Sequence, residues 1–507
     1  MSTRSTSTRL AVVISACLLA SLVGTAPGNA GPAWTAGSPD VSRDALSGAA
    51  LNALAAIAQR DRPLSIAAPQ VAGPDQPASL VNDPTDDATA QDTQSETTIT
   101  VAGPNLVAAF NDSGSFIGGE SHFTGYSTSS DGGQTWTDRG QLPDSSEGDA
   151  GDPVLATDTT SGRVYMATLG FNTFTNIQMF RSDDNGATFG QPVNATPGFG
   201  STNAFQDKEW VTVDNYPGAG QGNVYLGWRQ FGGPGEGLKF TRSTDGGATW
   251  GPNQGTPILP GDGQGAFVVV SPDHCVHFFY LSDIFGGNII KVRKSCDQGV
   301  TFGPAVTITD IQAGGINGDL GLKGGLRSNT FPQAAVNPVT GTLYVTYSDL
   351  TATNGADVFL KSSTDGGATW SAPVRINRDG TDNDQFFPTV GITTTGRALM
   401  VGWYDRRRDA ANFDLARWSR VAAINARTGA LTFSSNFQLG PSFPVVIGQD
   451  PVINTVYMGD YDQIAADANN FYSTWADNSL SNAFHANQPD VRFGRVFRDG
   501  TILIGGL

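Results

Sequence analysis

The sequence predicts an all-β protein built as a β-propeller, in which four-stranded antiparallel blades form a ring around a central channel. An eight-residue pattern, Ser-x-Asp-x-Gly-x-Thr-Trp/Phe, occurs five times in the 507 residues. Each copy lies inside a longer unit of four short apolar runs in about 50 residues, the size of one propeller blade. The 63 Gly and 28 Pro agree with this fold, because they are typical of a chain with many turns.

Each copy of the eight-residue pattern has the position of a β-hairpin turn, since short alternating apolar runs precede and follow it. Its Asp can accept hydrogen bonds from amides further round the turn, and the Gly two places later supplies a positive φ. The closing Trp or Phe can bury its ring between neighbouring sheets. We therefore predict a structural role for the five aspartates, which are Asp131, Asp184, Asp245, Asp297 and Asp365.

The opening pair of strands of the longer unit recurs seven times. The first strands begin near Glu96, Asp152, Asp207, Phe267, Phe331, Phe387 and Asp460. The second strands end near Asp112, Leu169, Arg229, Asp283, Asp349, Asp405 and Asp477. Five units carry the pattern, whereas the sixth has a degenerate turn at Thr428-Gly429 and the seventh a short turn at Asp499-Gly500. We predict seven blades, with six as the alternative, and no long strand borrowed from the C-terminus.

The N-terminal part of the chain has a different composition from the repeats. Residues 1–30 have the features of a secretory signal, namely a basic start, an apolar stretch from Leu10 to Gly24 and small residues at the end. That stretch is too short for a transmembrane helix. Residues 31–90 are rich in Ala, Pro and Asp, with helical propensity over 43–59 and a linker in the remainder. We expect a secreted chain whose propeller spans 91–507.

The net charge of the chain excludes some classes of binding partner. Residues 1–30 contain two arginines and no acid, so their removal leaves 28 basic residues against 47 acidic ones. A surface this acidic repels nucleic acid and anionic membranes. It also disfavours anionic sugars, unless arginines are concentrated in one cleft. We expect a monomer with no nucleic-acid partner and no membrane insertion.

Two cysteines follow residue 30, and they lie on successive predicted strands joined by a hairpin. Residues that pair across one antiparallel hairpin have residue numbers with a constant sum. Pairing Tyr280 with Lys291 therefore places Cys275 opposite Cys296, because the residue numbers of the two pairs have the same sum. A cross-strand disulfide fits a secreted protein. The alternative is a metal site, since two histidines flank Cys275, but the four histidines of the chain form no second cluster. We predict the disulfide, and no pattern indicates a cofactor, although structural calcium stays open.

The geometry of a propeller indicates where a ligand would bind. The first strand of each blade starts on one face and the second strand returns to that face, so residues at these points ring the mouth of the channel. The boxes, as we name the eight-residue turns, fall on the opposite face. Acids, arginines and aromatic residues gather at the predicted mouth, where they could bind carboxylates, stack on sugar rings and transfer protons. The alternative is that charged ladders simply close the channel.

The five boxes resemble the Asp-box, or BNR repeat, of the sialidase-like β-propellers, and the resemblance covers Glu96 to the C-terminus. In that family the box is structural and lies away from the active site. The chain is similar to secreted proteins labelled exo-α-sialidase from these repeats. It departs from sialidases at the Arg-Ile-Pro motif that precedes their first box, because the equivalent strand here reads Gln94-Ser95-Glu96-Thr97-Thr98. Sialidase catalytic domains also have six blades.

The resemblance implies partial stand-ins for the sialidase site, which combines three arginines, a Tyr–Glu nucleophile pair and an Asp acid. The implied catalytic residues are Glu209, Tyr404, Asp405 and Asp152, with Tyr461 as the other candidate tyrosine. The resemblance implies Arg229, Arg327 and Arg406 as substrate-binding arginines, and the position of the predicted mouth adds Glu96, Asp207, Asp460, Tyr461 and Trp475. Arg406 is the expected main anchor, with the alternative that it only pairs with Asp405 to tie two blades together.

Three functions stay open at this point. The first is a secreted propeller that binds glycan at the mouth, and whether it also acts as a glycoside hydrolase is not decided. The second is a non-catalytic propeller that binds a glycan or a protein, which predicts a mouth filled by its own salt bridges. The third is a lyase of acidic polysaccharides that uses Tyr404 or Tyr461 with Arg406. Two carboxyl groups at catalytic separation would favour hydrolysis.

Overall fold

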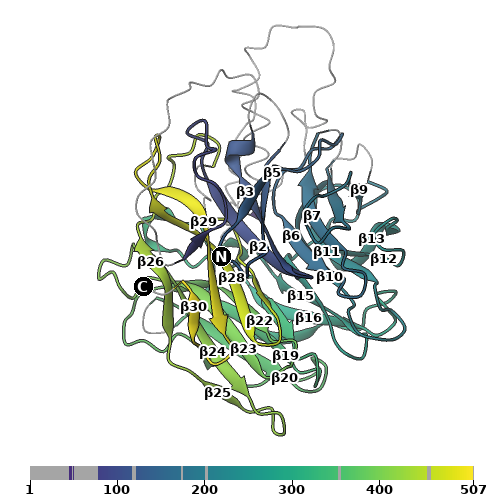
Figure 1. Ribbon diagram of the computed structural model, residues 1–507. Helices are drawn as coiled ribbons and strands as arrows, with labels where there is room; N and C mark the ends of the chain where they lie inside the picture. The colour runs from purple at the N-terminus through teal and green to yellow at the C-terminus, as the bar shows by residue number, and fades with distance from the viewer. Residues whose placement is uncertain are drawn as a thin grey trace, which may run out of the picture.

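The computed structural model describes residues 45–47, 50, 78–116, 122–172, 175–199, 204–351, 355–453 and 458–505. These residues form seven antiparallel sheets of four or five strands, which confirms the predicted propeller and its seven blades. In Figure 1 the blades follow one another in sequence order, so that yellow β28 and β29 of blade 7 lie beside purple β2 of blade 1. Within the described ranges, no helix has the length and hydrophobicity needed to cross a membrane.

Each of the first four blades is a sheet of four strands that are consecutive in the sequence. Blade 1 holds β2 (Gln94–Ala102), β3 (Asn105–Asp112), β4 (Thr124–Ser129) and β5 (Thr137–Gln141). Blade 2 holds β6 (Val154–Thr157), β7 (Val164–Gly170), β8 (Asn176–Ser182) and β9 (Val193–Asn194). Blade 3 holds β10 (Phe205–Val213), β11 (Val224–Phe231), β12 (Gly237–Ser243) and β13 (Gly251–Pro260). Blade 4 holds β14 (Gln264–Val270), β15 (Val276–Ser282), β16 (Ile289–Ser295) and β17 (Val306–Asp310).

The last three blades complete the ring. Blade 5 holds β18 (Gln333–Val336), β19 (Leu343–Leu350), β20 (Ala356–Ser363) and β21 (Val374–Arg375). Blade 6 holds β22 (Gln385–Ile392), β23 (Ala398–Asp405), β24 (Leu415–Ile424), β25 (Leu431–Phe433) and β26 (Phe437–Phe443). Blade 7 holds β27 (Ile464–Ala466), β28 (Asn470–Leu480), β29 (Gln488–Phe497) and β30 (Ile502–Ile504). All starts of first strands and ends of second strands fall within four residues of the predicted points.

Blade 7 is completed by residues from both ends of the chain. Both β30 and the two-residue strand β1 (Ser79–Leu80) pair with β29. The amide of Val81 extends this pairing by donating to the carbonyl of Val491 at 2.9 Å. The ring therefore closes without a long strand borrowed from the C-terminus. Strand β1 lies within the predicted linker, and its two residues show no alternation that would indicate a strand.

All five boxes form the same hydrogen-bonded turn. In the third box, Asp245 Oδ1 accepts from the amides of Ala248 and Thr249 at 3.0 and 2.9 Å, and Oδ2 accepts from the Thr249 hydroxyl at 2.6 Å. The Ser243 hydroxyl accepts from the amide of Gly247, whose φ is 78°. The bonds from the Thr amide to the Asp and from the Gly amide to the Ser recur in the other four boxes.

The closing aromatic residue of a box packs against the preceding blade. Phe189 of blade 2 meets Tyr126 of blade 1 edge to face, with ring centroids 5.2 Å apart. Trp136 of blade 1 meets Phe493 of blade 7 at the same centroid distance. Because such contacts stabilise beyond the area they bury, the boxes both shape the hairpins and join neighbouring blades.

Replacing Asp245 with Ala is expected to lower the free energy of unfolding by about 1–2 kcal/mol, because the turn loses its acceptor. Burial alone would raise the pKa of Asp245, but the hydrogen bonds from Thr249 and Ser243 outweigh it and lower the pKa to about 2. This contribution is therefore present above the unfolded pKa and is lost as the pH falls toward 2. Urea unfolding of both proteins at several pH values measures it. Unchanged unfolding with lost ligand binding would contradict the structural role.

Cys275 and Cys296 form a disulfide across the hairpin of β15 and β16, with their Cα atoms 4.3 Å apart. The register follows the predicted pairing of Tyr280 with Lys291. We expect thiol titration of the unreduced, denatured protein to detect Cys17 alone if residues 1–30 are still present, and no thiol if they have been removed. Changing both bonded cysteines to Ser should cost about 3 kcal/mol of stability, since the bond spans 21 residues. Two further reactive thiols would refute the pairing.

Candidate active site

Five carboxyl side chains from blades 1, 2, 3 and 7 converge at the mouth of the channel and are at most 4% exposed. This acidic cluster consists of Glu96, Asp152, Asp207, Glu209 and Asp460. Burial, and then the charge of Asp152, raises the pKa of Glu96 and Glu209 well above the ordinary range. The same two causes raise the pKa of Asp207 to about 7. The cluster is therefore electrostatically coupled, and part of it holds protons at neutral pH.

A recurrent bulge in the innermost strands directs these residues. The pairing register shifts at Glu96 between β2 and β3, and at Lys208 between β10 and β11. Glu96, Asp152 and Lys208 have φ values of 51°, 52° and 52°, a region that non-glycine residues rarely adopt. A bulge inserts an extra residue and re-aims side chains. Blade 6 repeats the bulge at Phe387, whose φ is 48°, so the bulge is a recurrent feature of the innermost strands that positions acids in blades 1, 2 and 3.

Hydrogen bonds fix the Glu96 carboxyl between three blades. Its Oε1 accepts from the amide of Asp460 at 2.7 Å, and its Oε2 accepts from Asn111 Nδ2 at 3.1 Å. The same Asn111 accepts from the amide of Asp152 at 2.8 Å. Asp152 lies close enough to Glu96 for its carboxyl to raise the pKa of Glu96 further, beyond the effect of burial. Asn111 therefore holds Glu96 and Asp152 side by side.

Glu209 and Asp152 are the least satisfied members of the cluster. Among the described residues, the carboxyl oxygens of both lack a hydrogen-bond partner. Burial and the charge of Asp152 raise the pKa of Glu209 well above its ordinary range, which favours its protonated form. Because buried polar groups are nearly always paired, an orphaned carboxyl of this kind indicates a missing ligand or water. A protonated carboxyl can donate a hydrogen bond or a proton to an incoming oxygen atom.

Two cations accompany the cluster. Lys208 Nζ lies over the ring of Tyr461, 3.8 Å from its centroid. Arg327 Nη1 lies 3.6 Å from Asp460 Oδ1, which also accepts from Asn329 Nδ2 at 3.1 Å. Both cations already have partners, so the mouth stays acidic. The sequence places Lys208 at the mouth without a role, and it does not reveal Asn329, because a single neutral amide gives no sequence signal.

Aromatic rings form the floor of the mouth. Trp210 stacks on Phe267 at a centroid distance of 4.0 Å and meets Tyr461 edge on at 5.7 Å. Trp210 and Phe267 also line a hollow of about 630 Å³ that opens at the other end of the channel, beside the turns between the first and second strands at Thr159 and Asn215. The hydroxyl of Tyr461 donates to the carbonyl of Pro153 at 2.9 Å, and burial with the charge of Asp152 raises its pKa well above 10. Tyr461 therefore remains a neutral phenol beside the acids.

An N-terminal segment of the protein covers the acidic cluster. The amide of Ser47 donates to Asp207 Oδ2 at 2.8 Å, and Gln264 Nε2 donates to the same oxygen at 2.8 Å. Gln264 and Arg327 also donate to backbone carbonyls within residues 45–47. The helix predicted over 43–59 falls largely outside the described residues.

The structure does not bring Tyr404 and Asp405 to the acidic cluster. The hydroxyl of Tyr404 donates to the carbonyl of Ala476 at 3.2 Å and accepts from its amide at 2.9 Å, which ties blade 6 to blade 7. Asp405 Oδ2 accepts from Trp403 Nε1 at 2.7 Å and from Arg407 Nη2 at 2.6 Å. Strand β23 does end where the sequence predicts, but its last side chains hold blades together.

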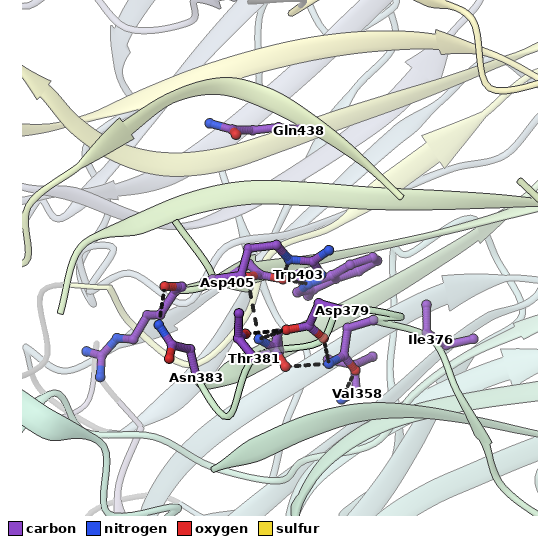
Figure 2. A network of polar contacts seen from close by, with 12 residues as sticks. Val358, Ile376, Asp379, Thr381, Asn383, Trp403, Asp405 and Gln438 are labelled. Carbon is purple, nitrogen blue, oxygen red and sulfur yellow. Dashed lines mark hydrogen bonds and ion pairs between the residues drawn. The ribbon is translucent and has the colours of Figure 1, made fainter. Parts of the chain in front are cut away.

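A polar network occupies the space around Asp405, between blades 5 and 6. Figure 2 shows Asp405 and Trp403 beside Asp379 and Thr381, with dashed lines marking their contacts. Gln385 Nε2 lies 3.4 Å from both Asp379 Oδ2 and Asp405 Oδ1 and so bridges the two acids. Asp405 is therefore saturated by protein groups.

The predicted arginines are each paired with a different acid. Arg406 Nη1 lies 3.5 Å from Asp384, and its Nη2 donates to a backbone carbonyl at 3.0 Å. Arg229 Nη2 lies 2.7 Å from Glu236. Since Arg327 pairs with Asp460, the described contacts show no three-arginine clamp. The ion-pair partner of Asp405 is Arg407 and not Arg406, which corrects the alternative pairing.

Trp475 is also remote from the acids. Its side chain is fully buried in β28, and its indole lies beside Gly440 of β26. The position explains the glycine, because a side chain at residue 440 would press on the indole ring. Trp475 therefore packs blade 7 against blade 6.

Residues of the types that bind metals gather at one place in the described part of the protein. Asp273, Cys275 and Cys296 have their ligand atoms within 4.8 Å of one another. Both sulfurs belong to the disulfide, so neither is a thiolate ligand. The carboxyls of the acidic cluster do not meet this distance condition. Their arrangement suits hydrogen bonding and proton transfer.

The chain matches no protein-family model and no curated protein. It is similar in structure to a protein of unknown function from Dyadobacter fermentans, at 15% identity over 73% of this chain and 98% of that one, with a TM-score of 0.42. An α-L-arabinanase from Penicillium chrysogenum matches at 16% identity over 66% and 94% of the two chains, with a TM-score of 0.43. An intramolecular trans-sialidase from Ruminococcus gnavus matches at 14% over 81% and 96%, with a TM-score of 0.38. The fold is a seven-bladed β-propeller of antiparallel sheets.

Proposed function

We propose that this protein is a secreted glycoside hydrolase that binds neutral glycans at the channel mouth. The observation that carries the proposal is the convergence of five buried carboxyls from four blades, in which burial and mutual charge raise the pKa of Glu96 and Glu209. Glycoside hydrolysis needs one carboxyl that protonates the leaving oxygen and a second, ionised carboxylate that acts as nucleophile or base. A coupled acidic cluster supplies both forms at one pH.

Glu209 and Asp152 are the proposed catalytic pair. Glu209 is the proposed acid, because burial and the charge of Asp152 raise its pKa well above the ordinary range and neither of its oxygens is partnered among the described residues. Asp152 is the proposed second carboxyl, because it lies close enough to Glu96, Asp207 and Glu209 to raise the pKa of each. Asn111 positions it by accepting from the Asp152 amide, and the same side chain donates to Glu96. The proton moves from Glu209 to the glycosidic oxygen as the bond from that oxygen to the sugar carbon breaks, and the carbon bonds instead to Asp152 or to a water molecule that Asp152 deprotonates.

The chemistry of the mouth selects the class of glycan. Five carboxyls outnumber Lys208 and Arg327, and both cations are already engaged. The carboxylate of a sialoside or uronate would be repelled by the acidic cluster. Such like-charge contacts weaken the binding free energy by roughly several kcal/mol. Sugar hydroxyls, by contrast, could satisfy buried oxygens of Asp207, Glu209 and Asp460 that lack partners. Neutral glycans are the preferred ligands.

The other two functions fit less well. A lyase would need a tyrosine that loses its proton, whereas the pKa values of Tyr461 and Tyr404 are raised well above 10 by burial and nearby acids. A non-catalytic glycan-binding propeller is the second candidate. It is favoured by the covered state of the acidic cluster, in which backbone from residues 45–47 contacts Asp207.

A glycan array tests the binding class. The full-length protein and a Ser47→Pro variant, which lacks the amide that contacts Asp207, are applied to neutral, sialylated and uronate-containing oligosaccharides. We expect binding to neutral glycans at least about tenfold tighter than to charged analogues. Asp245→Ala, changed in a box far from the mouth, is the matched control and should bind normally. Binding confined to sialylated or uronate glycans would overturn the proposal.

A further inference from the structure

The mouth recognises the backbone of an N-terminal segment. Asp207 Oδ2 accepts from the amide of Ser47 at 2.8 Å, and Gln264 Nε2 donates to the carbonyl of residue 45 at 2.9 Å. Arg327 Nη2 donates to the carbonyl of residue 46. One acceptor and two donors from blades 3, 4 and 5 thus match three consecutive residues. None of these bonds depends on the identity of the bound side chains.

The segment is also packed as a ligand would be. Ala45, Leu46, Ser47 and Ala50, which we call the covering segment, are at most 2% exposed. Leu46 and both alanines belong to the same apolar cluster as the inner strands of blades 2–4. The hydroxyl of Ser47 accepts from the amide of Ala50 at 3.1 Å, in the manner of a helix N-cap, and so fixes the shape of the segment.

We propose that the channel mouth is a polypeptide-binding surface whose resident ligand is the covering segment of the same protein. A peptide that binds here needs two consecutive carbonyls that accept from Gln264 and Arg327, followed by a backbone amide that donates to Asp207. The residue before that amide carries an apolar side chain. Asp207 is fully buried and Arg327 is partly buried, and hydrogen bonds that involve an ionised group are stronger than neutral ones. The segment therefore competes for the groups that any other ligand must use.

Binding of the covering segment would also affect access of a glycan to the mouth. This consequence rests on the proposed function, whereas the binding of the segment itself is independent of that function. A glycan that reaches Asp207 and Glu209 must first displace the covering segment. Release of the segment then opens the acidic cluster. The apparent affinity of the covered protein is reduced by the fraction of molecules in which the segment is bound.

Hydrogen–deuterium exchange of the full-length protein tests the binding of the segment. We expect the amide of Ser47 to exchange at least about 100-fold more slowly than in a synthetic peptide of residues 41–60, because exchange requires opening of the mouth. Ser47→Thr keeps the amide and a hydroxyl, and should retain this protection. Exchange of Ser47 at the rate of the free peptide, with the strands still protected, would overturn the proposal.

A second variant separates a bound ligand from a part of the core. In Leu46→Asp the covering segment should lose protection while β2 and β10 keep theirs. Loss of protection in β10 as well would show that the segment is an integral part of the fold, against the proposal. Adding a neutral oligosaccharide to the wild-type protein should speed exchange at Ser47. A protected segment that no neutral glycan disturbs would support the segment as ligand and count against the glycan function.

Discussion

Raising the pH from about 4 to about 8 is expected to lower the stability of this protein by a few kcal/mol, on the order implied by its buried acids. Burial and the charge of Asp152 raise the pKa of Asp207 to about 7, against an unfolded value near 3.8. Between these values the native state keeps a proton that the unfolded state has released. Stability therefore falls as the pH rises through this window, and it levels off above the folded pKa.

Urea unfolding of the wild type and Asp207→Asn at several pH values measures this effect. The amide cannot ionise but keeps an oxygen acceptor, so the variant should show a shallower slope and greater stability at pH 8. Asp87 and Asp490, with pKa values raised by burial to about 9 and about 7, lie outside the acidic cluster and leave part of the slope in place. If the free energy of unfolding depended on pH equally in the wild type and in Asp207→Asn, then Asp207 would not have the raised pKa that the account gives it.

Glu209→Gln should abolish most turnover without lowering stability. Removal of a general acid typically costs about 10²- to 10⁴-fold in rate. The fold should tolerate the change, because a neutral amide of the same shape replaces a carboxyl whose pKa burial and the charge of Asp152 raise well above the ordinary range. Steady-state kinetics and thermal melting of the variant provide the measurement. Asp245→Ala gives the opposite pattern, with lower stability and normal turnover per folded molecule. Normal turnover in Glu209→Gln would remove Glu209 from the mechanism.

The fold was predictable because its signals are local. A box specifies its own hairpin through bonds within eight residues, so five copies determine both the strands and their spacing. The pairing of Tyr280 with Lys291 follows from the same hairpin geometry. In contrast, the two-residue strand β1 is specified by its partner β29, far away in the sequence. No local pattern could reveal it.

The site was predictable in position but not in composition. Strand ends placed Glu96, Asp152 and Glu209 at the mouth, and the structure gathers them there. The end of β23 was predicted equally well, yet its acid is held by the adjacent Arg407. Which side chain enters the channel depends on bulges with positive φ, and these leave no trace in a sequence of non-glycine residues. The covering segment lies 219 residues from Gln264, so only the folded protein shows that contact.

Product formation from a neutral oligosaccharide, followed by proton NMR, tests the central claim most directly. The wild type and Ser47→Pro are incubated with a panel of neutral oligosaccharides and with sialyllactose, and hydrogen exchange confirms that the covering segment of the variant is open. We predict new reducing ends from at least one neutral glycan, formed faster by Ser47→Pro, and no release of sialic acid. An open Ser47→Pro variant that neither binds nor cleaves any neutral glycan would contradict the account.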